Sequence, residues 1–302
     1  MYSFVTLFSA VAIILFVLLI SQLFMLAEEC LFYKKTDAGE RVKGRSCQIV
    51  YKLNGDGHFP KPLFAASITL LAIFLFIPMG SLPQFISTPA DLFIVAFLLL
   101  SAHALYMKGI KIFSKDRYQL MEIKEINSFF YFVAVLLIIG GTLSWYVLNR
   151  GMPGNIFSID AYSAMLLWLH TDYYGKIALA LFFLLLAVGS PSRERRIFCE
   201  SREITLSDIF EATLSTAGAA IIAAIFLPHK YALGFGITGT AMFSVDFLCF
   251  WLEVFVLQTM ILPLIKRLYF NFMKRKCVKL RYLPGILACA LGVILMMIDL
   301  YF

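Results

Sequence analysis

Residues Phe129–Leu148 read FFYFVAVLLIIGGTLSWYVL, a run without a single charged side chain. As one helix, this run is long enough to cross the hydrocarbon core of a bilayer. Glu125 lies just ahead of it, where a basic segment that begins at Lys108 gives way to apolar residues. A carboxylate there costs free energy unless it is paired, solvated or protonated. Two interpretations stay open: an interfacial acid beside Lys124, or a protonatable group at the entrance of a charged path into the membrane.

The rest of the chain also has the composition of a membrane protein. Of its 302 residues, 61% are hydrophobic and 15% are charged, whereas soluble domains carry about 25% charged residues. The mean hydropathy is +0.85. The six cysteines and four histidines are dispersed without a C-x-x-C pair, and no nucleophile–histidine–acid set or glycine-rich phosphate loop occurs. We therefore predict no catalytic residues and no zinc or iron–sulfur site in this chain.

Apolar runs separated by polar loops predict an all-α, polytopic membrane protein. The first run, Tyr2–Ala27, lacks a basic start and is longer than the core of a signal peptide, so we interpret it as a retained helix. Almost no sequence remains for a soluble domain, and we predict one integral membrane domain over residues 1–302. The eight expected transmembrane helices cover residues 3–27, 62–80, 90–108, 129–149, 174–189, 205–228, 240–265 and 283–300.

The basic residues predict the orientation of these helices. All but three of the 26 Lys and Arg residues lie in every second loop, and the exceptions are Arg150, Lys176 and Lys230. Basic loops of membrane proteins face the cytoplasm. We therefore expect both termini outside, and we interpret the net charge of +7 as a topology signal rather than a nucleic-acid surface.

Acidic residues within or near the spans are the candidate functional groups. Asp208 and Glu211 are three residues apart and share a helix face, as do Asp246 and Glu253, seven apart. An unpaired charge at Glu253, near mid-span, would cost about 2.5–3.5 kcal/mol. For Asp246 and Asp299 we favour placement at the outer interface. For Glu125, Glu211 and Glu253 a structural and a functional interpretation both stay open. The candidate proton path comprises Glu125, Asp208, Glu211 and Glu253.

Four segments of the chain follow the pattern of a known family. GERVKGRSCQIVYKL, Gly39–Leu53, keeps the order of the family's R-V-G-P-x-G-L-L-Q-P-L-x-D-x-L-K-L, without its prolines and exact spacing. Met121–Glu125 fits its M-x-x-x-E at a helix entrance, and Glu211 precedes a small-residue run that ends in Phe-Leu. The basic loop Lys266–Arg281 leads into a last helix through Tyr-Leu-Pro. In these segments the chain resembles the quinone-side membrane subunit of respiratory complex I and the related anchor subunits of energy-converting hydrogenases.

This resemblance implies a non-catalytic anchor subunit in the cytoplasmic (inner) membrane. Such a subunit docks cytoplasmic iron–sulfur or hydrogenase-like subunits, adjoins antiporter-like membrane subunits, and couples electron transfer to proton or sodium translocation. Hydride and electron chemistry would then belong to the partners, and no cofactor is expected in this chain. The family's acidic motif between helices five and six is replaced here by LAVGSPSRERRIFCES, which argues against a quinone site. The expected docking residues are Arg41, Arg45, Arg193 and Arg196.

Two alternatives stay open. The first is a small-solute or ion transporter that uses the intramembrane carboxylates, although no internal repeat of the kind common in transporters is visible. The second is an assembly or scaffold protein that has lost ion transfer. The scaffold requires the same fold as the anchor subunit, so the sequence does not separate them.

Overall fold

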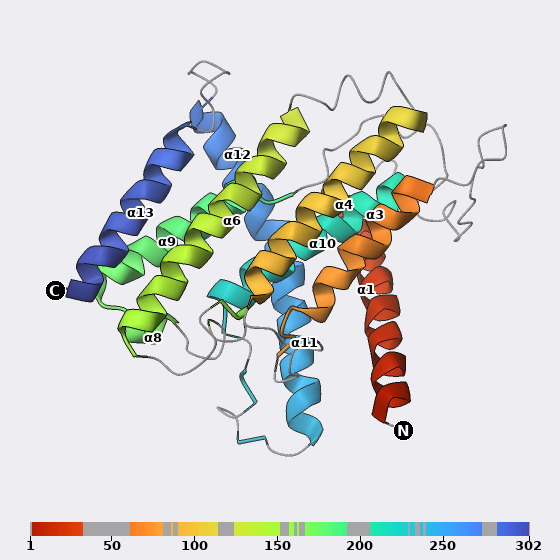
Figure 1. Cartoon of the computed structure of the whole chain (residues 1–302), viewed down its shortest axis with the longest axis horizontal. Coiled ribbons are helices and arrows are strands. Elements are labelled where there is room, and N and C mark those ends of the chain that lie inside the picture. The colour runs from red at the N-terminus through yellow and green to blue at the C-terminus, as the bar shows by residue number, and fades with distance from the viewer. Residues whose placement is uncertain are drawn as a thin grey trace. The chain divides into compact units, whose positions relative to one another are not determined.

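The computed structural model describes residues 2–32, 61–80, 86, 90–113, 124–151, 157–159, 162, 167–191, 206–228, 230–232, 236–237, 240–273 and 283–301. Within these ranges all regular elements are helices and no strand occurs, so the predicted all-α fold is confirmed (Figure 1). The helices are α1 (Tyr2–Phe32), α3 (Lys61–Ala72), η1 (Ile73–Leu75), α4 (Asp91–Phe113), α6 (Lys124–Asn149), α8 (Leu167–His170), α9 (Tyr173–Gly189), α10 (Leu206–Phe226), α11 (Thr240–Val256), η2 (Leu257–Ile261), α12 (Leu262–Met273) and α13 (Leu283–Tyr301).

Six helical stretches of the described chain are long and apolar enough to cross a membrane. They lie in α1, α4, α6, α10, the continuous α11–η2–α12 helix, and α13. Their length and composition indicate a multi-pass membrane protein. The other two expected spans correspond to shorter apolar helices, Lys61–Leu75 and Tyr173–Gly189. A helix of 17 residues such as α9 is about 26 Å long, slightly less than a bilayer core of about 30 Å.

The ends of five helices differ from the predicted boundaries by five residues or more. α4 ends at Phe113 instead of residue 108, and α6 begins at Lys124 instead of residue 129. α1 continues to Phe32 instead of stopping at residue 27, because Ala and Glu favour helix and a charge ends the apolar segment without ending the helix. α3 and η1 end at Leu75 instead of continuing to residue 80. Pro78 explains this early end, since a proline disfavours helical backbone at the residue before it.

The largest difference is in the helix expected over residues 240–265, which continues to Met273 with a π-helical turn inside it. η2 spans Leu257–Ile261, and Leu262 N–H donates to the carbonyl of Leu257. Pro263 follows directly; it has no N–H and its ring would clash with the carbonyl four residues earlier. The π-helical turn relieves this clash. Lys266, predicted in the basic loop, therefore lies within the helix, and its side chain is buried.

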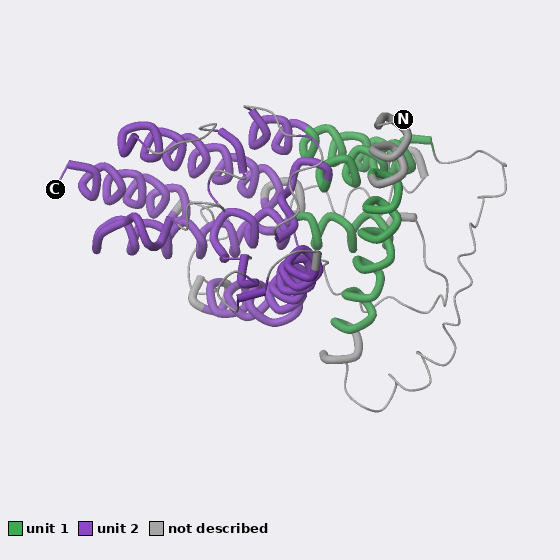
Figure 2. Tube along the Cα trace, turned by 90° about the horizontal axis from the view of Figure 1, so that it is seen from below, with its two compact units in different colours: residues 1–74, 98–122, 192–217 green, residues 75–97, 123–191, 218–302 purple. Residues whose placement is uncertain are grey.

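The chain forms two compact units (Figure 2). Unit 1 comprises residues 1–74, 98–122 and 192–217. Within it, α1 packs beside α3, and α3 lies against the second half of α4 at Gly109. A Cβ on Gly109 would lie 2.7 Å from the Leu63 side chain, so a glycine is needed for this close approach. The outward side chains of α1, including Leu15 and Leu19, are exposed, as expected for a surface that faces lipid.

Unit 2 comprises residues 75–97, 123–191 and 218–302, and its centre is the packing of α6, α9 and α13. The three helices lie side by side in Figure 1. The Tyr131 ring of α6 occupies the space left by Gly189 of α9 and Gly285 of α13. Gly292 of α13 accommodates Phe182 of α9 in the same way. A tyrosine and a phenylalanine set against glycines thus fix the register of the three helices.

Candidate functional site: polar groups within the membrane helices

In unit 1, α4 and α10 bring a tyrosine and a carboxylate together inside their membrane spans. The Tyr106 hydroxyl donates to Oε1 of Glu211 at 2.6 Å. The Tyr106 ring is buried and stacks on Phe210, with centroids 4.2 Å apart and planes inclined by 11°. His103, also buried, lies one turn earlier in α4, and its ring centroid is 6.4 Å from that of Tyr106. The sequence predicted Glu211 as a candidate, but its tyrosine partner is 105 residues away in the chain.

In unit 2, two acids of α11 bind the segment that precedes the helix. The Tyr231 hydroxyl donates to Oε1 of Glu253 at 2.6 Å, and the backbone N–H of Ala232 donates to Oδ1 of Asp246 at 2.8 Å. Burial, followed by the hydrogen bond to Glu253, raises the pKa of Tyr231, so the phenol stays a donor. The second carboxylate oxygen of Glu253, Oε2, is buried and has no hydrogen-bond partner in the described part of the chain.

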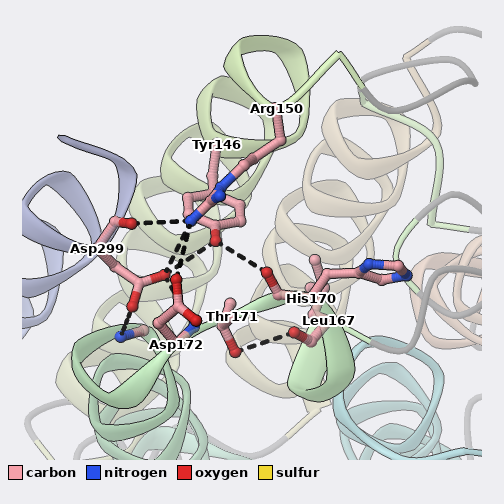
Figure 3. A network of polar contacts seen from close by, with 8 residues as sticks. Tyr146, Arg150, Leu167, His170, Thr171, Asp172 and Asp299 are labelled. Carbon is pink, nitrogen blue, oxygen red and sulfur yellow. Dashed lines mark hydrogen bonds and ion pairs between the residues drawn. The ribbon is translucent and has the colours of Figure 1, made fainter. Parts of the chain in front are cut away.

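The most extensive polar network lies where α6, α9 and α13 meet (Figure 3). The Asp299 side chain is fully buried near the end of α13. Its Oδ1 accepts the Gly175 N–H at 2.7 Å, and its Oδ2 accepts the Tyr146 hydroxyl at 2.9 Å and the Asp172 N–H at 3.3 Å. Two of these donors are backbone groups at the start of α9, where a helix has unpaired N–H groups and a partial positive charge. Asp299 therefore caps α9 from a different helix.

Arg150 completes this network on its solvent side. Its guanidinium donates to the Asp299 carbonyl at 2.9 Å, lies 3.8 Å from Oδ2 of the same residue, and covers the Tyr146 ring with its carbon 5.4 Å from the centroid. It also meets Asp172 at 3.4 Å, but that carboxylate is 77% exposed, so the pair adds little stability. Partial desolvation works against the Arg150 charge, yet Tyr146, Asp172 and Asp299 outweigh it and raise the pKa of the guanidinium. This network has a structural role, because the Asp299 carboxylate and the Arg150 guanidinium hold each other in place.

Two further buried polar contacts connect elements of unit 2. Asp91, at the start of α4, accepts the Ser158 hydroxyl at 3.0 Å. Lys266 donates its ammonium to the Ser190 carbonyl at the end of α9, the helix end where a positive charge is favoured. Asp91, Asp246 and Asp299 are all acids near the spans, and the sequence favoured placement at the outer interface for Asp246 and Asp299. In the structure all three residues are buried within the protein.

The structure brings together some of the predicted site residues and leaves others undescribed. Glu211 and Asp208 lie three residues apart in α10, both half-buried, whereas Glu253 lies in unit 2 with Asp246. Glu125 falls in the first turn of α6, but its side chain lies outside the described residues. The predicted docking residues lie outside them as well: Arg41, Arg45, Arg193 and Arg196.

Sequence reasoning missed the tyrosines that bind these carboxylates and the role of Arg150. The spacing of residues along one helix predicts which face they share, but it carries no signal for a partner on another helix. Gly175, in the first turn of α9, leaves room for Asp299, since a Cβ there would lie 2.5 Å from Oδ2 of Asp299, but the sequence does not connect this glycine with Asp299.

Among the described residues, no group of three or more His, Cys, Asp or Glu side chains is placed to hold a metal ion. Comparison of the chain with models of protein families finds no match, and comparison with curated proteins finds none either. Function therefore has to be argued from the residues themselves.

Proposed function

We propose that this chain is a membrane subunit of a complex-I-like or membrane-hydrogenase-like complex. It anchors a cytoplasmic redox module and takes part in coupling electron transfer to proton or sodium translocation. The resemblance at Gly39–Leu53, Met121–Glu125, Glu211 and Lys266–Arg281 supports this proposal, as do the apolar helices. The shorter helices α3–η1 and α9 complete eight spans with both termini outside, each needing little more than local thinning of the bilayer.

The observation that carries the proposal is the pairing of Tyr106 with Glu211. An ionisable residue inside a membrane span is expensive and commonly marks an ion or proton path. The phenol–carboxylate hydrogen bond is short, which is typical of a charge-assisted bond. His103 adds a third group that can take up or release a proton within one turn of the same helix. His103, Tyr106 and Glu211 thus place three proton-exchanging groups near one another, with a hydrogen bond between the last two.

The docking role belongs to the basic cytoplasmic loops. Arg41 and Arg45 follow α1 in the chain, and Arg193 and Arg196 follow α9. Arginine binds carboxylates through two parallel hydrogen bonds, which suits an interface with an acidic soluble subunit. Redox chemistry then stays with the iron–sulfur or hydrogenase-like partners, while antiporter-like membrane subunits share the translocation.

Purification from the native membrane, followed by a proton-pumping assay, tests the proposal. We expect iron–sulfur and antiporter-like subunits to co-purify with the chain. In inverted vesicles, Glu211→Gln and Tyr106→Phe should impair acidification measured by dye quenching, while electron transfer continues in uncoupled vesicles. Asp172→Asn is the matched control, because it removes an exposed carboxylate outside the spans. Normal pumping in Glu211→Gln would remove the proton-transfer role.

One observation favours the alternative of a solute or ion transporter. The π-helical turn η2 lies inside a candidate membrane span, and Gln258 and Thr259 are buried within it. Such π-helical turns frequently occur at functional sites. Purification as a monomer or homodimer without redox subunits would favour this alternative over the anchor subunit.

A further inference from the structure

A second carboxylate–tyrosine pair, in unit 2, is built differently from the first. Glu253 lies near the middle of the candidate span Ala241–Tyr269. As a helix, these 29 residues are about 43 Å long, against about 30 Å for a bilayer core. Glu253 is therefore far from either end of the helix, and its carboxyl must be neutral or satisfied by neighbours.

The partner of Glu253 comes from the connection between α10 and α11 and not from another membrane helix. Two consecutive residues of this connection, Tyr231 and Ala232, bind Glu253 and Asp246 respectively. The two acids are seven residues apart on α11, which is about 10.5 Å along the helix. The Ile237 N–H donates to the Ala232 carbonyl at 2.9 Å and closes the backbone beside this anchor. The segment Lys230–Ala232 thus lies along α11 and places the Tyr231 hydroxyl on the Glu253 carboxyl.

The hydrogen bonds of Glu253 are unevenly distributed between its two oxygens. Oε1 receives the Tyr231 hydroxyl, while Oε2 is buried without a partner in the described residues. Among the described titratable groups, those that act on the Glu253 carboxyl are Tyr231 from the connection and Cys249 from α11, and neither of these two is a cation. Lys230, next to Tyr231 in the connection, is exposed. A negative charge on Oε2 would be uncompensated, whereas an O–H bond at this atom removes the charge.

From this geometry we infer that Glu253 is a proton-binding group, and that Tyr231 is the cover that controls its access to water. A proton taken from water forms an O–H bond at Oε2, and the same bond breaks when the proton returns to water. Opening requires that the Lys230–Ala232 segment leave α11, which breaks the Tyr231–Glu253 and Ala232–Asp246 hydrogen bonds. A transition metal fits poorly, because no group of three His, Cys, Asp or Glu side chains forms a metal site among the described residues. The inference rests on the proposed ion-transfer function for its physiological role, although the chemistry of the site can be tested alone.

Carbodiimide labelling of the full-length protein in membrane vesicles provides the test. A protonated carboxyl gives its proton to a carbodiimide nitrogen, its oxygen bonds the central carbon, and the adduct rearranges to a stable N-acylurea without a leaving group. We expect apolar dicyclohexylcarbodiimide to label Glu253, with labelling that falls as the pH rises, detected by peptide mass spectrometry. A water-soluble carbodiimide should label Glu253 several-fold less in the wild type and several-fold more in Tyr231→Ala. Asp299 is the internal control, because both its oxygens accept hydrogen bonds, and it should stay unlabelled.

Three results would overturn the inference. These are no labelling of Glu253 by the apolar reagent, equal labelling of the wild type by both reagents, and protection of Glu253 by excess sodium at constant pH. The last result would make Glu253 a sodium ligand instead of a proton site. Tyr231→Phe keeps the ring in place and removes only the hydrogen-bond donor. If Tyr231→Ala does not fold, the pH dependence of Glu253 labelling in the wild type and in Tyr231→Phe still decides whether the inference holds. Because labelling needs no partner subunits, it can fail while the Glu211→Gln result supports the proposed function, so the two failures are distinguishable.

Discussion

Replacing Asp299 by Asn tests whether this carboxylate holds the α6–α9–α13 packing together. All the groups around its two oxygens are donors: the N–H groups of Gly175 and Asp172, the Tyr146 hydroxyl and the Arg150 guanidinium. Asn keeps one acceptor, which can retain the Gly175 bond. Its NH₂ group, placed where Oδ2 was, cannot accept from the Asp172 N–H or from the Arg150 guanidinium.

The structure sets the size of the expected loss. Hydrogen bonds to a charged group contribute about 1.5–3 kcal/mol each. The Tyr146 hydroxyl can turn to accept from the new NH₂ group, so Asn loses one bond outright, the one from the Asp172 N–H. The Arg150 ion pair adds at most about 1 kcal/mol, because the guanidinium is 33% exposed and 3.8 Å away. We expect a total loss of about 2–3 kcal/mol. At roughly 2–4 °C per kcal/mol, this lowers the melting temperature by about 5–10 °C.

Thermal unfolding of the detergent-purified protein measures this loss. Gly175→Ala should lower the melting temperature as well, because the added Cβ would lie 2.5 Å from Oδ2 of Asp299 and 2.7 Å from the Thr171 Cβ. The two variants share one contact, so the loss in the double variant should be smaller than the sum of the single losses. Asp172→Asn should change the free energy of unfolding by less than about 0.5 kcal/mol. A melting temperature for Asp299→Asn equal to that of the wild type would refute the capping role.

Three other predictions concern two glycines of α6, a buried tyrosine and the membrane topology. Gly140→Ala should destabilise the protein, because its Cβ would overlap the Leu92 side chain, whereas Gly141→Ala has nothing within 4 Å and should be neutral or stabilising in thermal unfolding. Burial, opposed by the hydrogen bond with a serine, raises the pKa of Tyr162 to about 12. Since an unfolded tyrosine ionises near pH 10, stability should fall as the pH rises from about 10 to about 12, and Tyr162→Phe should reduce that fall in melts at several pH values. A cysteine placed at Ser192 should react with a membrane-impermeant maleimide only from the cytoplasmic side; labelling from outside would refute the eight-span topology.

The sequence alone determined the class of fold and the approximate position of its membrane helices. An uncharged run such as Phe129–Leu148 has few alternatives to a helix in lipid, because the backbone polar groups must be satisfied within the segment. The small-residue run in α10 predicted close helix packing, and 89% of its span Asp208–Phe226 is buried. Helix ends were less predictable. Once the structure is known, nearby prolines account for two of these differences: Pro78 for the end of η1, and Pro263 for the π-helical turn.

Only the tertiary structure decided which polar groups meet. Periodicity placed Glu211 and Asp208 on one face, and Glu253 and Asp246 on another, yet each glutamate binds a tyrosine elsewhere in the chain. Tyr146 and Asp299 are 153 residues apart, and no local pattern pairs them. Their meeting depends on the register of α6, α9 and α13, which is set by the fit of Tyr131 and Phe182 against glycines. Helical spacing fixes the direction in which a side chain points, but its partner is chosen by the packing of helices that are distant in sequence.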